Sequence, residues 1–207
     1  FGLYLISGST LLESLFGVAL ILALFVCVVL HEFGHALVAR RFDVPTRDIT
    51  LYPIGGIARL RQIPKQPRKE FLIAVAGPAV NCVIAGILFA VLLLSGATVS
   101  AEVLMEPHTH FLGKLMWLNV IIVGFNLLPA FPMDGGRVLR ALLASRMDYL
   151  RSTQIAARIG QVMAFLFGLI GLMFFNPILL FIALFVYIGA QQEAHMTMTR
   201  LVTEGVP

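Results

Sequence analysis

Long apolar runs without formal charge are the feature that most constrains how this chain can fold. The first run, residues 14–39, contains a single charged residue, Glu32, and the runs 71–101, 115–133 and 159–192 contain none. The hydrocarbon core of a bilayer is about 30 Å thick, and about 20 helical residues cross it. The runs therefore predict membrane-spanning helices.

The small supply of charge supports the same assignment. Hydrophobic residues make up 59% of the 207 residues and charged residues only 13%, about half the charged share of soluble domains. The net charge of +4 resides in short segments beside the apolar runs, which is how membrane proteins set their orientation. We therefore expect an integral membrane protein that contacts the lipid bilayer and has no nucleic acid partner.

The run 159–192 is too long for one crossing. Its 34 residues would extend about 51 Å as a helix, and the turn-forming pair Asn176-Pro177 lies near its middle. Two helices joined by a tight turn are predicted there, which gives five complete spans in all. Residues 1–12 are expected to be the remnant of an earlier span. Residues 1–207 are predicted to form a single domain, because no repeat or linker interrupts them.

Lysine and arginine predict which ends of the spans face the cytoplasm. Residues 40–70 contain eight of them, 102–114 one, 134–158 five, the Asn-Pro turn none and the tail one. Cytoplasmic loops carry the excess of positive charge. The segments 40–70 and 134–158 are therefore predicted to be cytoplasmic.

Residues 44–63 are not expected to be helical. Prolines and the pair Gly55-Gly56 interrupt this segment around the β-favouring run 49–52. A short hairpin or pair of strands at the cytoplasmic face is predicted, with an irregular loop as the alternative. The expected fold class is thus an all-α polytopic membrane protein. It would have five complete transmembrane helices, a partial N-terminal one, and a small cytoplasmic-side β-hairpin or sheet.

Three ionisable side chains stand together near the end of the first complete span, in the sequence His31-Glu32-Phe33-Gly34-His35. Histidines four residues apart lie on one helical face, so both imidazoles can bind one metal ion. Catalytic zinc keeps one coordination position for water, and Glu32 is suited to act as the general base toward that water. A polar patch at a helix end is the alternative, but ionisable side chains inside a membrane are costly and mark functional sites.

A catalytic zinc site needs a third protein ligand. The next three carboxylates along the chain belong to the basic segment, whereas the histidines lie about 10 Å of helix below its start at Arg40. Asp134 ends the run 115–133, and the predicted orientation brings it to a similar depth. We therefore predict that His31, His35 and Asp134 hold one Zn²⁺ per chain, nearer the cytoplasmic side. An ordinary interfacial role is the alternative for Asp134.

The approach to Asp134 is not expected to be a regular helix. Pro129 and Pro132 lie three residues apart, and two glycines follow Asp134. Non-helical backbone at membrane depth is tolerated where it is buried or lines a watery cavity, and a peptide could dock against it there. Asn126 could orient a substrate carbonyl or stabilise an oxyanion, and a hydrogen bond between helices is the alternative.

Two patterns resemble the site-2 protease family of intramembrane zinc metalloproteases, most closely its compact archaeal and bacterial members. They are His-Glu-x-x-His at 31–35 and Asn-x-x-Pro-x-x-x-x-Asp-Gly at 126–135. Gly55-Gly56 matches the family's Gly-Gly segment, and residues 77–81 resemble its Gly-Pro-x-x-Asn.

The resemblance implies hydrolysis of peptide bonds within or next to the transmembrane segment of membrane-protein substrates in a prokaryotic cell membrane, as in regulated intramembrane proteolysis. It assigns zinc to His31, His35 and Asp134 and catalysis to Glu32. Substrate contacts are expected at Gly55, Gly56, Asn126 and Pro129, with the strands near the Gly-Gly pair holding the unwound substrate by β-addition.

Two other classes of protein remain in view. A metal transporter would use the same residues as a transport site, but such proteins often show internal repeats and polar residues along several spans. A structural zinc protein would bind partners without catalysis. Glu32 has no task in a transporter, which favours the protease. No pattern in the sequence predicts an oligomeric state.

Overall fold

The computed structural model describes residues 11–44, 46–52, 55–60, 66–97, 99–104 and 111–203. Its elements are, in chain order, α2 (Leu11–Arg41), β1 (Thr46–Tyr52), β2 (Gly55–Leu60), α3 (Pro67–Leu94), the 3-10 helix η1 (Ala101–Leu104), α4 (Phe111–Asn126), α5 (Asp134–Ala144), α6 (Tyr149–Met173) and α7 (Pro177–Thr203). The predicted remnant of an earlier span lies outside the described residues, apart from the first two residues of α2.

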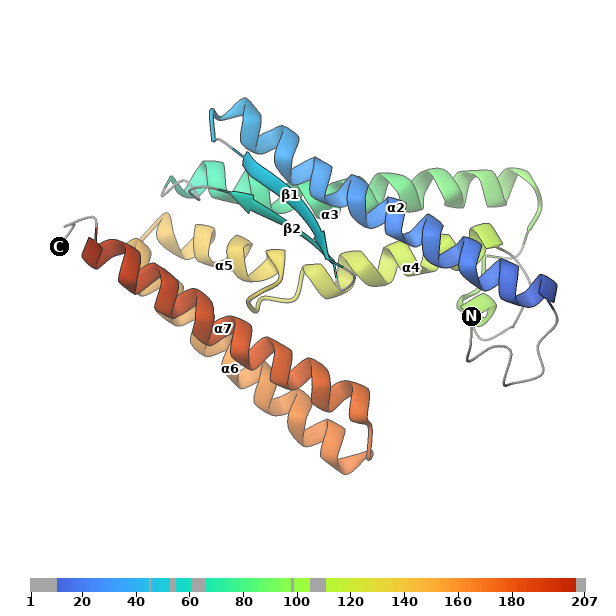
Figure 1. Ribbon diagram of the computed structural model, residues 1–207. Coiled ribbons are helices and arrows are strands. Elements are labelled where there is room, and N and C mark those ends of the chain that lie inside the picture. The colour runs from blue at the N-terminus through green and yellow to red at the C-terminus, as the bar shows by residue number, and fades with distance from the viewer. Residues whose placement is uncertain are drawn as a thin grey trace.

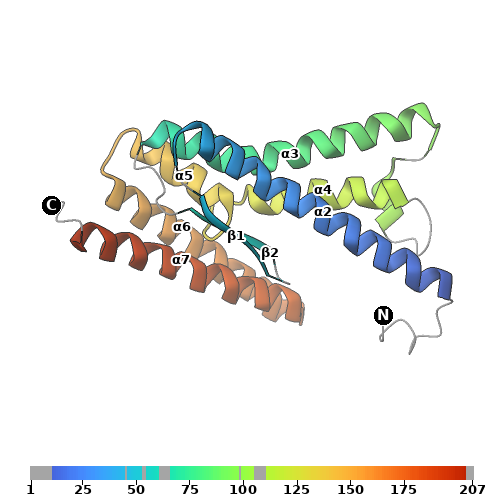
Figure 2. The same ribbon diagram turned by 45° about the horizontal axis from the view of Figure 1, so that its top comes forward.

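The helices form two groups that α5 connects. In Figures 1 and 2, α2, α3 and α4 lie together as one block, and α6 and α7 form a hairpin that diverges from it. The short helix α5 contacts α3 on one side and α6 on the other. Residues that are distant in sequence therefore meet where α5 begins.

Among the described residues, four helices are long and apolar enough to cross a membrane, namely Glu13–Arg41, Pro67–Leu94, Tyr149–Met173 and Pro177–Thr199. The prediction of five complete spans is wrong. The predicted span 115–133 is instead divided between α4, a helix of 16 residues, and an irregular segment that leads into α5. The two prolines of that segment cannot continue a helix, so α4 ends before them.

The two strands pair antiparallel, with Thr46 opposite Leu60 and Tyr52 opposite Gly55. This pairing is the pair of strands predicted within residues 44–63, but the predicted place of the pair at the cytoplasmic face is wrong. Both strands contact α2 and run back along it, from its C-terminal end toward its middle (Figures 1 and 2). A lone strand at that depth would leave its backbone groups without partners, whereas each strand of the pair serves the other.

The predicted turn between the last two spans is confirmed. The side-chain oxygen of Asn176 accepts hydrogen bonds from the backbone amides of Ile178 and Leu179, which caps the start of α7. Small residues let the two helices approach: a Cβ on Gly160 would lie 3.4 Å from the Cβ of Ala190 and 3.4 Å from that of Ala130.

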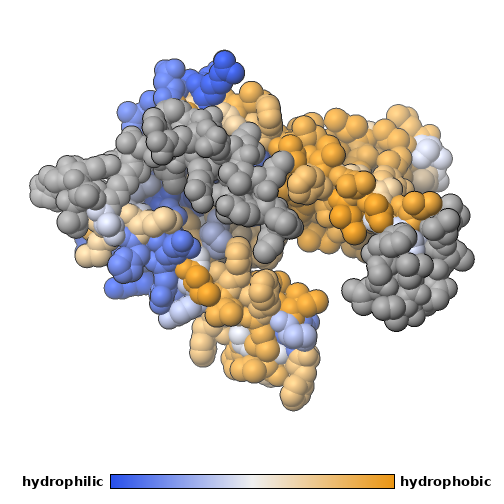
Figure 3. Space-filling model, in the orientation of Figure 1, coloured by the Kyte–Doolittle hydropathy of each residue, from blue (hydrophilic) through white to orange (hydrophobic). Residues whose placement is uncertain are grey.

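Hydrophilic and hydrophobic surfaces are separated along the molecule. In Figure 3 the hydrophilic residues gather at the end where α2 ends and α3 begins, and the long sides of the helices are hydrophobic. Large apolar side chains such as Leu22, Val83, Phe165 and Phe181 are exposed on these sides. Such continuous apolar surface suits lipid and not water.

Candidate metal centre and active site

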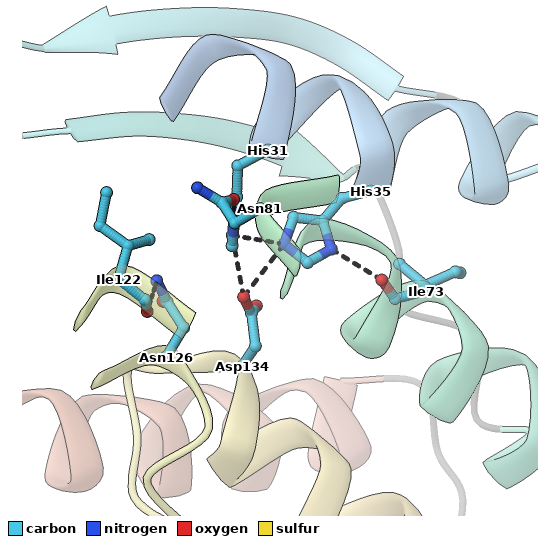
Figure 4. A network of polar contacts seen from close by, with 7 residues as sticks. All are labelled: His31, His35, Ile73, Asn81, Ile122, Asn126 and Asp134. Carbon is cyan, nitrogen blue, oxygen red and sulfur yellow. Dashed lines mark hydrogen bonds and ion pairs between the residues drawn. The ribbon is translucent and has the colours of Figure 1, made fainter. Parts of the chain in front are cut away.

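Three side chains from two helices meet at one buried point. His31 and His35 come from α2, and Asp134 is the first residue of α5 (Figure 4); their exposed fractions are 5%, 4% and 7%. The Nε2 atoms of the two histidines lie 3.1 Å apart, and each lies 3.1 Å from Oδ2 of Asp134. The structure therefore brings together the three residues that the sequence predicts as metal ligands.

The spacing of these three atoms fits a metal ion. Oxygen and nitrogen ligands lie about 2.0–2.1 Å from zinc, so two ligands of a tetrahedral site lie about 3.3 Å apart. The observed triangle, with sides of 3.1 Å, is close to that value. One ion can thus contact all three residues, each of which offers one ligand atom.

The chemistry of the three atoms also fits a cation. Nδ1 of His35 donates a hydrogen bond of 2.7 Å to the carbonyl oxygen of Ile73, and Nδ1 of His31 donates one of 2.7 Å to Oδ1 of Asn81. Each neutral imidazole then turns the lone pair of Nε2 toward the carboxylate of Asp134. Three electron-rich atoms that face one another repel, and a bound cation removes that repulsion.

The helix α3 orients both imidazoles, a role that the sequence analysis did not assign. It supplies Asn81 and the carbonyl of Ile73, and such partners fix the tautomer and the ring orientation of metal-binding histidines. Asn81 belongs to the Gly-Pro-x-x-Asn pattern at 77–81. The spacing of this pattern could have indicated the role, because Gly77 and Asn81 are four residues apart and share one face of the helix.

Gly77 lets the backbone of α3 pass directly beside the ligand atoms. A Cβ at this position would collide with Nε2 of His35 and lie 2.6 Å from Nε2 of His31. Real Cβ atoms essentially never approach other atoms more closely than 3.0 Å. The position therefore requires glycine if both imidazoles are to keep their places.

The segment 127–133 folds against the first turn of α5. Gly135 and Gly136, which were expected to interrupt the helix, lie within that turn. A Cβ on Gly135 would collide with the backbone of residues 127 and 128, and one on Gly136 would lie 2.7 Å from the carbonyl carbon of Ala130. The glycines thus allow the loop and the helix to touch, and Asp134 lies at the helix N-terminus, where the helix dipole favours its negative charge.

Glu32 is half-buried beside the three ligands. Its carboxylate interacts electrostatically with His35, His31 and Asp134. A general base must lie near the water from which it takes a proton, so the role of Glu32 as the base stays a prediction.

The predicted substrate contacts are distributed around this point. Nδ2 of Asn126 donates a hydrogen bond of 3.0 Å to the carbonyl of Ile122 within its own helix (Figure 4). Pro129 is exposed, and Gly55 and Gly56 are the first residues of β2. Substrate binding by these four residues stays a prediction.

A second buried polar cluster joins α3, α5 and α7. Nε of Arg140 donates to Oε1 of Glu70 at 2.7 Å, and its Nη1 donates to Oε1 of Glu193 at 2.6 Å. The guanidinium also lies 5.0 Å from the ring centroids of Phe131 and Tyr149. Burial opposes the charge of Arg140, but the carboxylates of Glu70 and Glu193 raise its pKa above the ordinary value. The sequence analysis placed Glu70 and Arg140 in two cytoplasmic segments and gave no sign of their pairing.

Peptidase family M50 matches residues 19–106 and 97–167 of the chain. With the centre described above, this match shows that the chain belongs to peptidase family M50, the site-2 proteases, and it confirms the resemblance read from the motifs. The chain is a multi-pass membrane protein of that family.

Individual relatives agree with the assignment. A zinc metalloprotease of Methanocaldococcus jannaschii is 43% identical over 192 residues, which are 93% of this chain and 54% of that protein. Stage IV sporulation protein FB of Bacillus subtilis is 28% identical over 149 residues, 72% of this chain and 48% of that protein. The chain thus spans about half the length of these relatives. The solved structure of the site-2 protease from Methanocaldococcus jannaschii superposes with a TM-score of 0.69 at 42% identity and covers 93% of this chain and 83% of that one.

Proposed function

We propose that this protein is a zinc endopeptidase that hydrolyses peptide bonds within or next to the transmembrane segments of membrane proteins. The observation that carries the proposal is the meeting of three ligand atoms, 3.1 Å from one another, between a membrane-spanning helix and the start of α5. The relative named a zinc metalloprotease at 43% identity supports zinc as the metal.

The metal ligands and Glu32 have different roles in the proposed reaction. His31, His35 and Asp134 would hold the zinc ion, which when bound polarises a carbonyl group and makes water a stronger nucleophile. Glu32 takes the proton from the attacking water and passes it to the leaving amine nitrogen. Because a helical substrate keeps its carbonyl groups in internal hydrogen bonds, the segment to be cleaved must unwind first.

A transmembrane substrate suits the surroundings of the centre. The space-filling view is hollowed between the block of α2 and α4 and the hairpin of α6 and α7, and both sides of the hollow are largely hydrophobic (Figure 3). A membrane-embedded segment can approach through such a hollow without meeting bulk water. The distribution of lysine and arginine supports a centre nearer the cytoplasmic side of a prokaryotic cell membrane.

Two substitutions test the proposal on a single-span test substrate. Glu32→Gln keeps the shape of the side chain but removes the base, so cleavage should fall about 10²–10⁴-fold while zinc stays bound. Asp134→Ala removes a ligand, so both zinc content and cleavage should be lost. Glu102→Gln, an exposed carboxylate on η1, is the matched control and should cleave like the wild type. Undiminished cleavage by Glu32→Gln would refute the assignment of the base.

A further inference from the structure

A chain of buried amides extends from the metal ligand His31 through α3 to α4. Oδ1 of Asn81 accepts the hydrogen bond from Nδ1 of His31, and Nδ2 of Asn81 donates to Oδ1 of Asn119 at 2.8 Å. Nδ2 of Asn119 in turn donates to the backbone carbonyl oxygen of Leu115 at 2.8 Å. Both asparagines are fully buried. Their polar groups cannot reach water and depend on these hydrogen bonds.

The hydrogen bond to Leu115, at the far end of this chain, determines which atom donates in each of the other hydrogen bonds. The carbonyl oxygen of Leu115 can only accept, so Asn119 must point its amino group toward it. Each asparagine side chain has one oxygen and one amino group, so the oxygen of Asn119 then faces Asn81. Asn81 must donate to that oxygen, and its own oxygen faces His31. Nδ1 of His31 therefore carries the proton, and its Nε2 keeps a free lone pair.

The contact of Asn119 with Cys27 of α2 is compatible with these hydrogen-bond directions. Its amino group also lies 3.5 Å from the sulfur of Cys27, which is a weak acceptor. An amino group has two hydrogens, so it can serve both Leu115 and Cys27. Asn119 thus contacts the helix that carries the histidines as well as the helix that orients them.

The imidazole itself does not determine which nitrogen carries the proton. A neutral histidine can carry it on either nitrogen, and the hydrogen bond made by one nitrogen decides the state of the other. If the amide of Asn81 were turned over, its amino group would face Nδ1 of His31 and favour a proton on Nε2. That proton would occupy the place of the metal.

We propose that Asn119 is a positioning residue for the metal centre. It holds Asn81 in the orientation that keeps Nε2 of His31 free for the metal, although it touches neither the metal nor the substrate. This inference rests on the proposed zinc centre, and it adds a residue of α4 to the elements that build that centre.

Two substitutions separate positioning from simple packing. Asn119→Leu keeps the branched shape of the side chain but neither holds nor orients Asn81, so the affinity for zinc should fall about 10–100-fold, as when a hydrogen-bond partner of a metal ligand is lost. Asn119→Asp keeps an oxygen that accepts from Asn81, and in its protonated form it can also donate to the carbonyl of Leu115, so its affinity should stay close to that of the wild type. A role in packing alone would not produce this difference.

The measurement is the zinc dissociation constant of the purified full chain in detergent, obtained by competition with a chelator. The absorption spectrum of the cobalt-substituted protein reports the ligand geometry independently of activity. Thr153→Val is the matched control, because Thr153 is buried on α6 and its hydroxyl donates to the carbonyl of Tyr149 in its own helix. If Asn119→Leu does not fold, Asn119→Ala takes its place.

The possible failures are distinguishable. If the wild type binds zinc and cleaves the test substrate but Asn119→Leu binds zinc equally tightly with an unchanged cobalt spectrum, the positioning role is refuted and the protease remains. If Asn119→Asp loses affinity as strongly as Asn119→Leu, the orientation argument is wrong. If the wild type binds no zinc, both proposals are refuted.

Discussion

Gly77 and the two imidazoles beside it show how closely the residues around the metal centre are fitted. A single Cβ at position 77 would enter the space of Nε2 of His35 and approach Nε2 of His31 to 2.6 Å. These are the atoms that would bind the metal. Neither imidazole can yield without breaking its bond to Asn81 or to the carbonyl of Ile73.

Gly77→Ala should therefore weaken zinc binding by about tenfold or more, the size of effect seen when the surroundings of metal ligands are disturbed. Gly86→Ala on the same helix is the control, because a Cβ there meets nothing within 4 Å. Zinc content after dialysis against a limiting chelator measures both variants. Equal retention of zinc by the two would show that the imidazoles can shift without loss.

The sequence predicted the ligands better than it predicted their supports. His31 and His35 share a helical face, and this local geometry needs no knowledge of the fold. The prediction of Asp134 as the third ligand required, in addition, only the predicted directions of the spans. The bonds from Asn81 to His31 and to Asn119 depend on how α2, α3 and α4 pack, and spacing along one helix does not reveal that packing.

At the scale of the elements, Arg140 fastens α5 to its neighbours. It lies on the helix that begins with Asp134, and it is bound to Glu70 of α3 and to Glu193 of α7. The position of Asp134 relative to the histidines thus depends on a second contact between α5 and α3. Both Arg140 and Glu70 are fully buried, so neither can find water as a substitute partner.

Arg140→Met should destabilise the fold by about 3–5 kcal/mol, because it leaves the buried charge of Glu70 without its partner. The double variant Glu70→Gln with Arg140→Met should recover much of this loss, since no unpaired charge then remains at Glu70. Thermal unfolding in detergent measures both. Arg146→Met, at an exposed arginine just beyond α5, serves as the control. If Arg140→Met alone is as stable as this control, the cluster contributes little to stability.

Elements that depend on local signals were predicted well, and those that depend on neighbours were not. The turn at Asn176-Pro177 followed from two residues. The length of α4 did not follow from hydropathy, because the apolar run continues through residues that the prolines remove from the helix. The course of β1 and β2 along α2 is a tertiary contact that no pattern within 44–63 encodes.

At the scale of the whole molecule, the metal would connect the first and second groups of helices. Its ligands come from α2, in one group, and from α5, which leads into the other. The helix α3 contacts both α2 and α5, and without a cation the three ligand atoms repel each other across this junction. Bound metal should therefore stabilise the arrangement of the whole chain.

Removal of the metal by a strong chelator should lower the melting temperature of the wild type. A ligand present at 100 times its dissociation constant stabilises the folded state by about 2.7 kcal/mol, and the shift should be reversed by added zinc. The melting temperature of Asp134→Ala should not respond to chelator or zinc. Differential scanning fluorimetry in detergent would reveal the contrast, and an equal response of the two proteins would place the stabilising metal elsewhere.

The shortness of α4 has a consequence for the lipid around the protein. Its 16 residues extend about 24 Å, whereas the hydrocarbon layer is about 30 Å thick. This mismatch is relieved by thinning of the membrane beside the helix or by polar groups that reach below the headgroups. Since α4 ends next to the loop that leads to Asp134, thinning of the membrane at that end of the helix would bring water closer to the metal centre. We therefore expect water to reach the centre from the membrane surface beside α4.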